Sequence, residues 1–312
     1  MHTSVMGFIQ RASSDGDKLE HADAGRSASE KISLMENGAA VLVASLFGNG
    51  LNYFFMLFLA RQLGMEQFGL YALGVTLFNT ALLVGCAGLD TGVIKFVSAY
   101  MAQGHAGAAR RVIATAVTVV TLLGVLTGIG FGMIAAPLST QLYQKPGLAV
   151  VLLCFAPALV FALVGAVLLA ALQAFQTVRY TVALKYLWEP VGKWVIAGIA
   201  IWAGWGLSGV VLGWVVVFGV TACLAGAVLV RQGRLGVADF ALLGRSDVRT
   251  LVTFSAPLLF ANLFGAVAPR VDVMLLGYWV SAEDVGVYLA AFQTAAVLAL
   301  ILGAFDVVFA PI

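Results

Sequence analysis

The apolar residues of this chain come in runs of about twenty, the feature that most constrains its fold. A helix rises about 1.5 Å per residue, so such a run crosses the roughly 30 Å hydrocarbon core of a bilayer. The runs do not alternate apolar with polar residues, as the strands of a membrane barrel do. Because 62% of the residues are hydrophobic and only 10% are charged, an ordinary soluble globule is excluded. The sequence therefore predicts an all-α polytopic membrane protein.

The pattern predicts about eight transmembrane helices, and the positions of Lys and Arg predict their orientation. Cations collect in the amino-terminal stretch and in the even-numbered loops, whereas the odd loops hold little more than Arg61 and Lys145. Cytoplasmic loops retain positive charge, so we expect the amino terminus to be cytoplasmic. The predicted crossings are residues 38–60, 69–93, 112–136, 149–172, 182–204, 207–230, 251–277 and 285–310.

Residues 53–74 and 270–291 form an internal repeat, each copy lying between two long apolar runs. The two copies align at an offset of 217 residues, and both run in the same direction through the predicted membrane. An internal repeat of this kind predicts two structurally equivalent lobes. The matched pairs are Glu66 with Glu283, Gly69 with Gly286 and Tyr71 with Tyr288.

The repeat and the polar stretches divide the chain into four parts. Residues 1–36 are polar and without an apolar period, which predicts a disordered cytoplasmic tail. Residues 37–230 form a lobe of six helices, and residues 231–250 form a cytoplasmic loop between lobes. Residues 251–312 hold helices seven and eight, the first two of the second lobe. Because four more helices would complete that lobe, we expect the chain to be a fragment of a protein with 12–14 helices.

Three charged residues of the fifth crossing are candidates for a substrate cavity. Lys185, Glu189 and Lys193 are spaced at i, i+4 and i+8, so they share one face of a helix. A charge at the bilayer centre costs at least about 2.5–3.5 kcal/mol unless it is paired or hydrated. The stripe either faces a polar cavity that accepts an anionic headgroup or satisfies itself as a Lys-Glu-Lys ladder. Pro190 favours the cavity, because a broken backbone ladder is tolerated best beside one.

Two further residues join the candidate cavity, and three aspartates are candidates for another role. Arg270 could bind an anionic ligand or bridge to another helix, and Asn52 could line the cavity or hydrogen-bond between helices. Asp90 and Asp306 end helices two and eight at nearly equivalent places of the repeat, and Asp272 lies within helix seven. These aspartates are candidates for ion coupling or for contacts between lobes.

The sequence lacks the residues that several classes of function require. The three histidines lie in the tail and a loop, and the cysteines lie singly in apolar runs, so no metal site or cofactor is expected. Neither a hydrolytic triad nor a phosphate-binding loop is present, so the chain is not expected to be an enzyme. A formal net charge of only +2 gives no reason to expect nucleic acid as a partner.

Six stretches carry a resemblance to a known family. Residues 60–72, 88–92 and 96–100 resemble the opening helices of bacterial polysaccharide and O-antigen repeat-unit flippases of the Wzx type. Residues 251–258, 270–277 and 285–288 resemble helices seven and eight of the same proteins. The resemblance implies membership of the multidrug, oligosaccharidyl-lipid and polysaccharide exporter superfamily. It implies two six-helix lobes around a cationic cavity and transport by alternating access.

The implied substrate is an undecaprenyl-diphosphate-linked oligosaccharide, carried across the bacterial cytoplasmic (inner) membrane for cell-surface polysaccharide and lipopolysaccharide biosynthesis. The implied partners are this lipid-linked substrate, membrane lipids, the polymerase and other polysaccharide-assembly proteins. One alternative is a cation-coupled small-molecule exporter of the same superfamily, and another is a truncated, non-transporting scaffold. The deep charge of the fifth crossing is mostly basic, which favours the flippase.

Overall fold

The computed structural model divides the chain into two units, Met1–Phe47 and Gly48–Ile312, and everything below concerns the second. The predicted tail and most of the predicted inter-lobe loop lie outside the described residues. For residues 178 and 296–309 the backbone is described without the side chain. The described residues are 44–175, 177–236, 239–240, 249, 251, 253–255, 257–259, 262 and 270–309.

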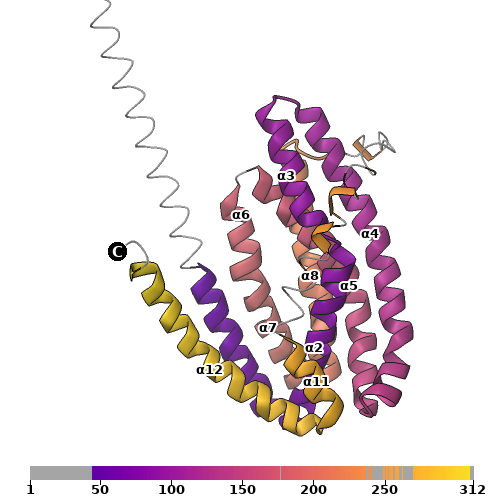
Figure 1. Ribbon diagram of the computed structural model, residues 1–312, viewed down its shortest axis with the longest axis vertical. Coiled ribbons are helices and arrows are strands. Elements are labelled where there is room, and N and C mark those ends of the chain that lie inside the picture. The colour runs from indigo at the N-terminus through magenta and orange to yellow at the C-terminus, as the bar shows by residue number, and fades with distance from the viewer. Residues whose placement is uncertain are drawn as a thin grey trace, which may run out of the picture. The chain divides into compact units, whose positions relative to one another are not determined.

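The described part of the second unit contains helices and no strands (Figure 1). Its first helix covers residues 48–63. The elements that follow are α2 (Met65–Cys86), α3 (Leu89–Ala102), α4 (Ala106–Pro137), the π-helical turn η1 (Leu138–Leu142), α5 (Pro146–Ala174), α6 (Val178–Val182), the π-helical turn η2 (Ala183–Trp188), α7 (Glu189–Trp202), α8 (Gly206–Arg231), α11 (Val271–Trp279) and α12 (Ala282–Phe309).

Four stretches among the described residues are long and apolar enough to cross a membrane: α2, α4 continued by η1, α5 and α8. They correspond to the predicted second, third, fourth and sixth crossings. Together they confirm the all-helical class and indicate a multi-pass membrane protein. The count of eight crossings stays a prediction, because the first and seventh extend outside the described residues.

The second crossing differs from its predicted bounds of 69–93. It begins at α2, breaks after Cys86 and continues through α3 to Ala102. At the break Ala87 and Gly88 both adopt the left-handed conformation, with φ of 48° and 73°. The predicted end of this crossing at residue 93 places Lys95 in the following loop, which is wrong, because Lys95 lies within α3.

The break places α3 against the start of the predicted seventh crossing. A Cβ atom at Gly88 would lie 3.0 Å from the Ser255 carbonyl oxygen, and the φ of this residue is 73°, so both the close approach and the backbone conformation favour glycine. Two turns further along α3, the ammonium of Lys95 lies 3.9 Å from the centre of the Phe254 ring. This cation–π contact joins the middle of α3 to the start of the predicted seventh crossing.

The core is built around α5, which packs against α2, α3, α4 and α8. Aromatic residues of α2, α5 and α8 meet edge to face at its centre. The Trp214 ring lies 5.4 Å from Phe78 and 5.2 Å from Phe155, and these three side chains are buried. Such offset and edge-on pairs are the arrangements that aromatic rings prefer.

The turns between helices gather at two ends of the unit (Figure 1). The α3–α4 and α5–α6 turns lie at the upper end in this view, and the α4–α5, α7–α8 and α11–α12 turns lie at the lower end. Large aromatic side chains at the lower end are exposed: Trp202 by 91%, Trp205 by 67% and Trp279 by 70%. Exposed tryptophans of this kind mark the level of lipid headgroups in membrane proteins.

Candidate functional site

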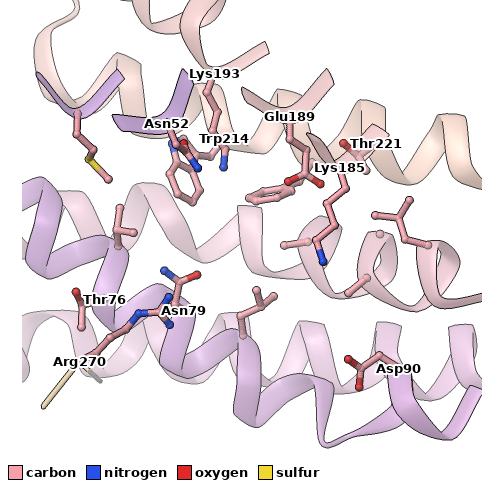
Figure 2. A pocket seen from close by; sticks show the side chains of 18 of the residues that line it. Asn52, Thr76, Asn79, Asp90, Lys185, Glu189, Lys193, Trp214, Thr221 and Arg270 are labelled. Carbon is pink, nitrogen blue, oxygen red and sulfur yellow. The ribbon is translucent and has the colours of Figure 1, made fainter. Parts of the chain in front are cut away.

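A cavity of about 870 Å³ lies between the helix over 48–63, α2, α3, α5, η2, α7, α8, α11 and α12 (Figure 2). Apolar groups make up part of its wall, and polar side chains from most of these elements point into it. Three cations and two carboxylates line it, so its formal charge is positive. The charged lining residues are Asp90, Lys185, Glu189, Lys193 and Arg270.

All five residues predicted for a substrate cavity line this one: Asn52, Lys185, Glu189, Lys193 and Arg270. They come from four separate elements, the helix over 48–63, η2, α7 and the start of α11. Figure 2 shows Arg270 beside Asn79, across the view from the three residues of η2 and α7. Their role in binding a substrate stays a prediction.

The predicted stripe of the fifth crossing is interrupted by a π-helical turn. Pro190 has no N–H and cannot donate to the carbonyl of Tyr186, four residues earlier. The backbone forms η2 just before this position instead of continuing as a regular α-helix. The backbone ladder is thus interrupted beside Pro190, and Lys185 and Glu189 line the same cavity. A π-helical turn inside a helix is common at functional sites.

Lys193 is held by aromatic rings. Its ammonium lies 4.2 Å from the centre of the Trp214 ring and 5.3 Å from that of Phe218. Among the described side chains no ion pair within 4.0 Å joins Glu189 to either lysine. The closed Lys-Glu-Lys ladder of ion pairs is thus not formed, and Lys193 makes cation–π contacts instead.

Lys185 and Arg270 are the more accessible cations of the cavity. Both are exposed, whereas Lys193 is only partly so. Arg270 precedes the first residue of α11, and Lys185 projects from η2 with its ammonium 5.9 Å from the centre of the Tyr186 ring. Two cations on separate walls can contact one anionic group from two sides.

The three candidate aspartates lie in different surroundings. Asp90 lines the cavity from the first turn of α3, so it does not end the second helix as predicted. Asp272 accepts a hydrogen bond of 2.6 Å from the Tyr288 hydroxyl and one of 2.8 Å from the Val273 amide, which pairs α11 with α12. The Asp306 side chain lies outside the described residues.

Several lining residues were not predicted. The hydroxyls of Thr76 and Thr221 donate hydrogen bonds to carbonyls of their own helices, at 2.9 Å to Ala72 and 2.9 Å to Val217. Trp214 was missed as the support of Lys193. The sequence held one signal for it: Trp214 and Phe218 are spaced at i and i+4, so two aromatic rings share one face of an otherwise mostly aliphatic helix.

An apolar helical bundle with a polar, formally cationic cavity defines a multi-pass membrane protein suited to holding an anionic molecule within the bilayer. Residues 34–312 match the model of the polysaccharide biosynthesis protein family, so the chain belongs to this family. The match confirms the resemblance at the level of the family. Searches of curated proteins and of solved structures found no match.

Proposed function

We propose that this protein translocates an undecaprenyl-diphosphate-linked oligosaccharide across the bacterial cytoplasmic membrane, as a step of cell-surface polysaccharide synthesis. Transport, by alternating access, is the proposed activity, with no catalytic step. The observation that carries the proposal is the pair of exposed cations, Lys185 and Arg270, on separate walls of one cavity inside an apolar bundle. Membership of the polysaccharide biosynthesis family supports the choice of substrate.

The energetics of the cavity favour an anionic headgroup. Each cation within the bilayer costs about 2.5–3.5 kcal/mol unless it is hydrated or paired. A diphosphate offers several strong acceptors, and each charge-assisted hydrogen bond contributes roughly 1.5–3 kcal/mol. The volume of about 870 Å³ suits a diphosphate with a few sugar units. The lipid tail would remain in the surrounding bilayer.

The placement of charges supports an orientation and a domain plan. Arg110, Arg179 and Arg231 lie in or beside turns at the upper end in Figure 1, and Glu283 and Asp284 lie at the lower end. We therefore propose that the upper end is cytoplasmic, with eight crossings divided into a six-helix lobe and two helices of a second lobe.

A second candidate function is a cation-coupled small-molecule exporter of the same superfamily. It is favoured by Asp90 and Glu189, whose carboxylates line the same cavity as the cations. Carboxylates inside a membrane are common sites for protons or sodium ions. In this case the carboxylates, and not the cations, would be essential.

The test is complementation of a bacterial strain that lacks its repeat-unit flippase. Lys185→Met with Arg270→Met removes two charge-assisted contacts, about 3 kcal/mol or more, and should lower surface polysaccharide at least about 100-fold. Arg111→Met removes an exposed cation outside the cavity and should have no effect at equal expression. Normal polysaccharide from the double variant would refute the proposal.

A separate pair of variants distinguishes the second candidate. Asp90→Asn and Glu189→Gln keep side-chain size and remove the negative charges. Loss of export in these variants, with Lys185→Met unaffected, would favour the cation-coupled exporter.

A further inference from the structure

The two copies of the repeat touch each other backbone to backbone at the lower end of the bundle. A Cβ atom placed on Gly69 would overlap the carbonyl oxygen of Ala282, and one placed on Gly286 would overlap the carbonyl oxygen of Met65. Both approaches are far below 3.0 Å, a separation that real Cβ atoms essentially never show. The starts of α2 and α12 can therefore meet this closely only with glycine at both positions.

The contact follows the symmetry of the repeat. The offset of 217 residues relates Gly69 to Gly286 and also relates Met65 to Ala282. Each copy therefore presents its glycine to the equivalent carbonyl of the other copy, as in a two-fold interface between identical subunits. Because the copies belong to different predicted lobes, this is a contact between lobes.

A polar clamp lies at the same end. Lys145, in the turn between η1 and α5, donates hydrogen bonds to the carbonyls of Gly277 and Val280, the latter at 2.8 Å. These carbonyls stand at the carboxyl end of α11, where a helix leaves its last acceptors free and attracts a cation. The clamp therefore ties the first lobe to the α11–α12 turn.

The cavity lies between the parts that these two contacts join. Arg270 and Gln293 line it from α11 and α12, and residues of α2, α7 and α8 line it from the first lobe. Contacts that join the lobes at one end of such a cavity close that end. The first contact is made by backbone atoms and the second by hydrogen bonds that water can replace, so both can part and re-form.

We propose that the Gly69–Gly286 contact and the Lys145 clamp together form the outer gate of the cavity, closed in this structure. Opening separates α2 from α12 and frees the α11 carbonyls to bind water. The assignment of this gate to the outer side rests on the proposed function and its orientation.

The gate is tested by labelling a cysteine in the cavity. Gln293→Cys serves as the reporter in the full chain with its three cysteines replaced by alanine, expressed in cells and treated with a membrane-impermeant maleimide. Gly69→Ala and Gly286→Ala place a methyl group against backbone, which should favour the open state and raise the labelling rate roughly five- to tenfold. Lys145→Met removes the ammonium of the clamp and keeps an unbranched side chain, so a smaller increase in the labelling rate, of about two- to threefold, is expected.

Two matched substitutions control for the extra methyl group. Gly130→Ala adds it to α4, where nothing lies within 4 Å. Gly198→Ala adds it to α7, where again nothing lies within 4 Å. Neither should change the labelling rate, since neither lies at the gate.

Equal labelling of Gly69→Ala, Gly286→Ala and Gly130→Ala would overturn the gate. If the two alanine variants do not accumulate in the membrane, Lys145→Met decides alone, and a rate equal to that of the parent reporter overturns it. Labelling does not depend on polysaccharide. If the gate variants label faster but the parent chain fails to complement the flippase-null strain, the gate would therefore be supported and the proposed substrate refuted.

Discussion

Replacing Lys193 with methionine, in the presence and in the absence of Trp214, measures how strongly the ring face stabilises an ammonium inside the bundle. The ammonium lies 4.2 Å from the centre of that ring, and Trp214 is only 6% exposed. Lys193→Met alone is a poor test, because it removes the cost of burying a charge together with the attraction. A double-mutant cycle isolates the attraction.

The expected coupling follows from the burial of the pair. A cation over an aromatic face gains about 0.5–1 kcal/mol at an exposed site and about 2 kcal/mol or more where water is excluded. Because the Trp214 ring is buried, the coupling free energy of this pair should lie near the top of that range, at about 1.5–2 kcal/mol. The Phe218 ring, at 5.3 Å, remains in every variant and cancels from the cycle.

The assay is unfolding of the purified protein in mixed micelles, followed by circular dichroism, for Lys193→Met, Trp214→Leu and the double variant. Trp194→Leu replaces Trp214→Leu in a control cycle. Its ring packs against Phe58 at 5.0 Å, and no cation among the described residues lies over it, so its coupling with Lys193 should stay within about 0.5 kcal/mol. A Trp214 coupling that is equally small would refute the cation–π interpretation.

Two further predictions concern stability. Trp194→Phe removes the indole donor to the Leu51 carbonyl, at 3.0 Å, and should cost roughly 1 kcal/mol of unfolding free energy, whereas Trp202→Phe, at a side chain 91% exposed, should change thermal unfolding little. Burial lowers the pKa of Lys145 in the folded protein below its ordinary 10.5. Between the lowered pKa and 10.5 the unfolded chain therefore binds more protons than the folded one, and stability rises with pH. The stability advantage of the parent over Lys145→Met should grow in thermal unfolding as the pH approaches 10.5, and a steady decline would contradict this.

The sequence predicted the helices best where the bilayer leaves no alternative. The third, fourth and sixth crossings were expected at 112–136, 149–172 and 207–230, and each lies inside an observed helix. Backbone groups in hydrocarbon must bond within their own segment, so an apolar run of this length is helical throughout. The observed helices extend a few residues further, because nothing in an apolar count marks where a helix continues into the headgroup region.

The break in the second crossing could not be read from composition. Ala87 is an ordinary helix former, and a glycine such as Gly88 occurs within many membrane helices. The left-handed conformation of Gly88 accompanies the close approach of Ser255, a residue about 170 positions away. Tertiary contact decided this position, and local propensity did not.

The candidate site was predictable in part for a similar reason. The i, i+4 spacing of Lys185 and Glu189 places both on one side of any helix, and the π-helical turn did not remove either from the cavity. The surroundings of Lys193 depend on α8, a separate helix, and spacing along one segment carries no information about its neighbour. The pairing of Asp272 with Tyr288 likewise requires the turn between α11 and α12 to be known.

The repeat shows most clearly what an alignment of two copies contains and what it leaves out. The offset makes Gly69 and Gly286 equivalent, and each glycine alone indicates a close approach of helices. Equivalence does not say that the two approach each other, which needs the arrangement of the lobes. The contact in turn explains which positions match. Met65 and Ala282 contribute only backbone carbonyls, so their side chains can differ, whereas each glycine must leave room for the opposite carbonyl. A substitution at either glycine therefore acts on both copies at once.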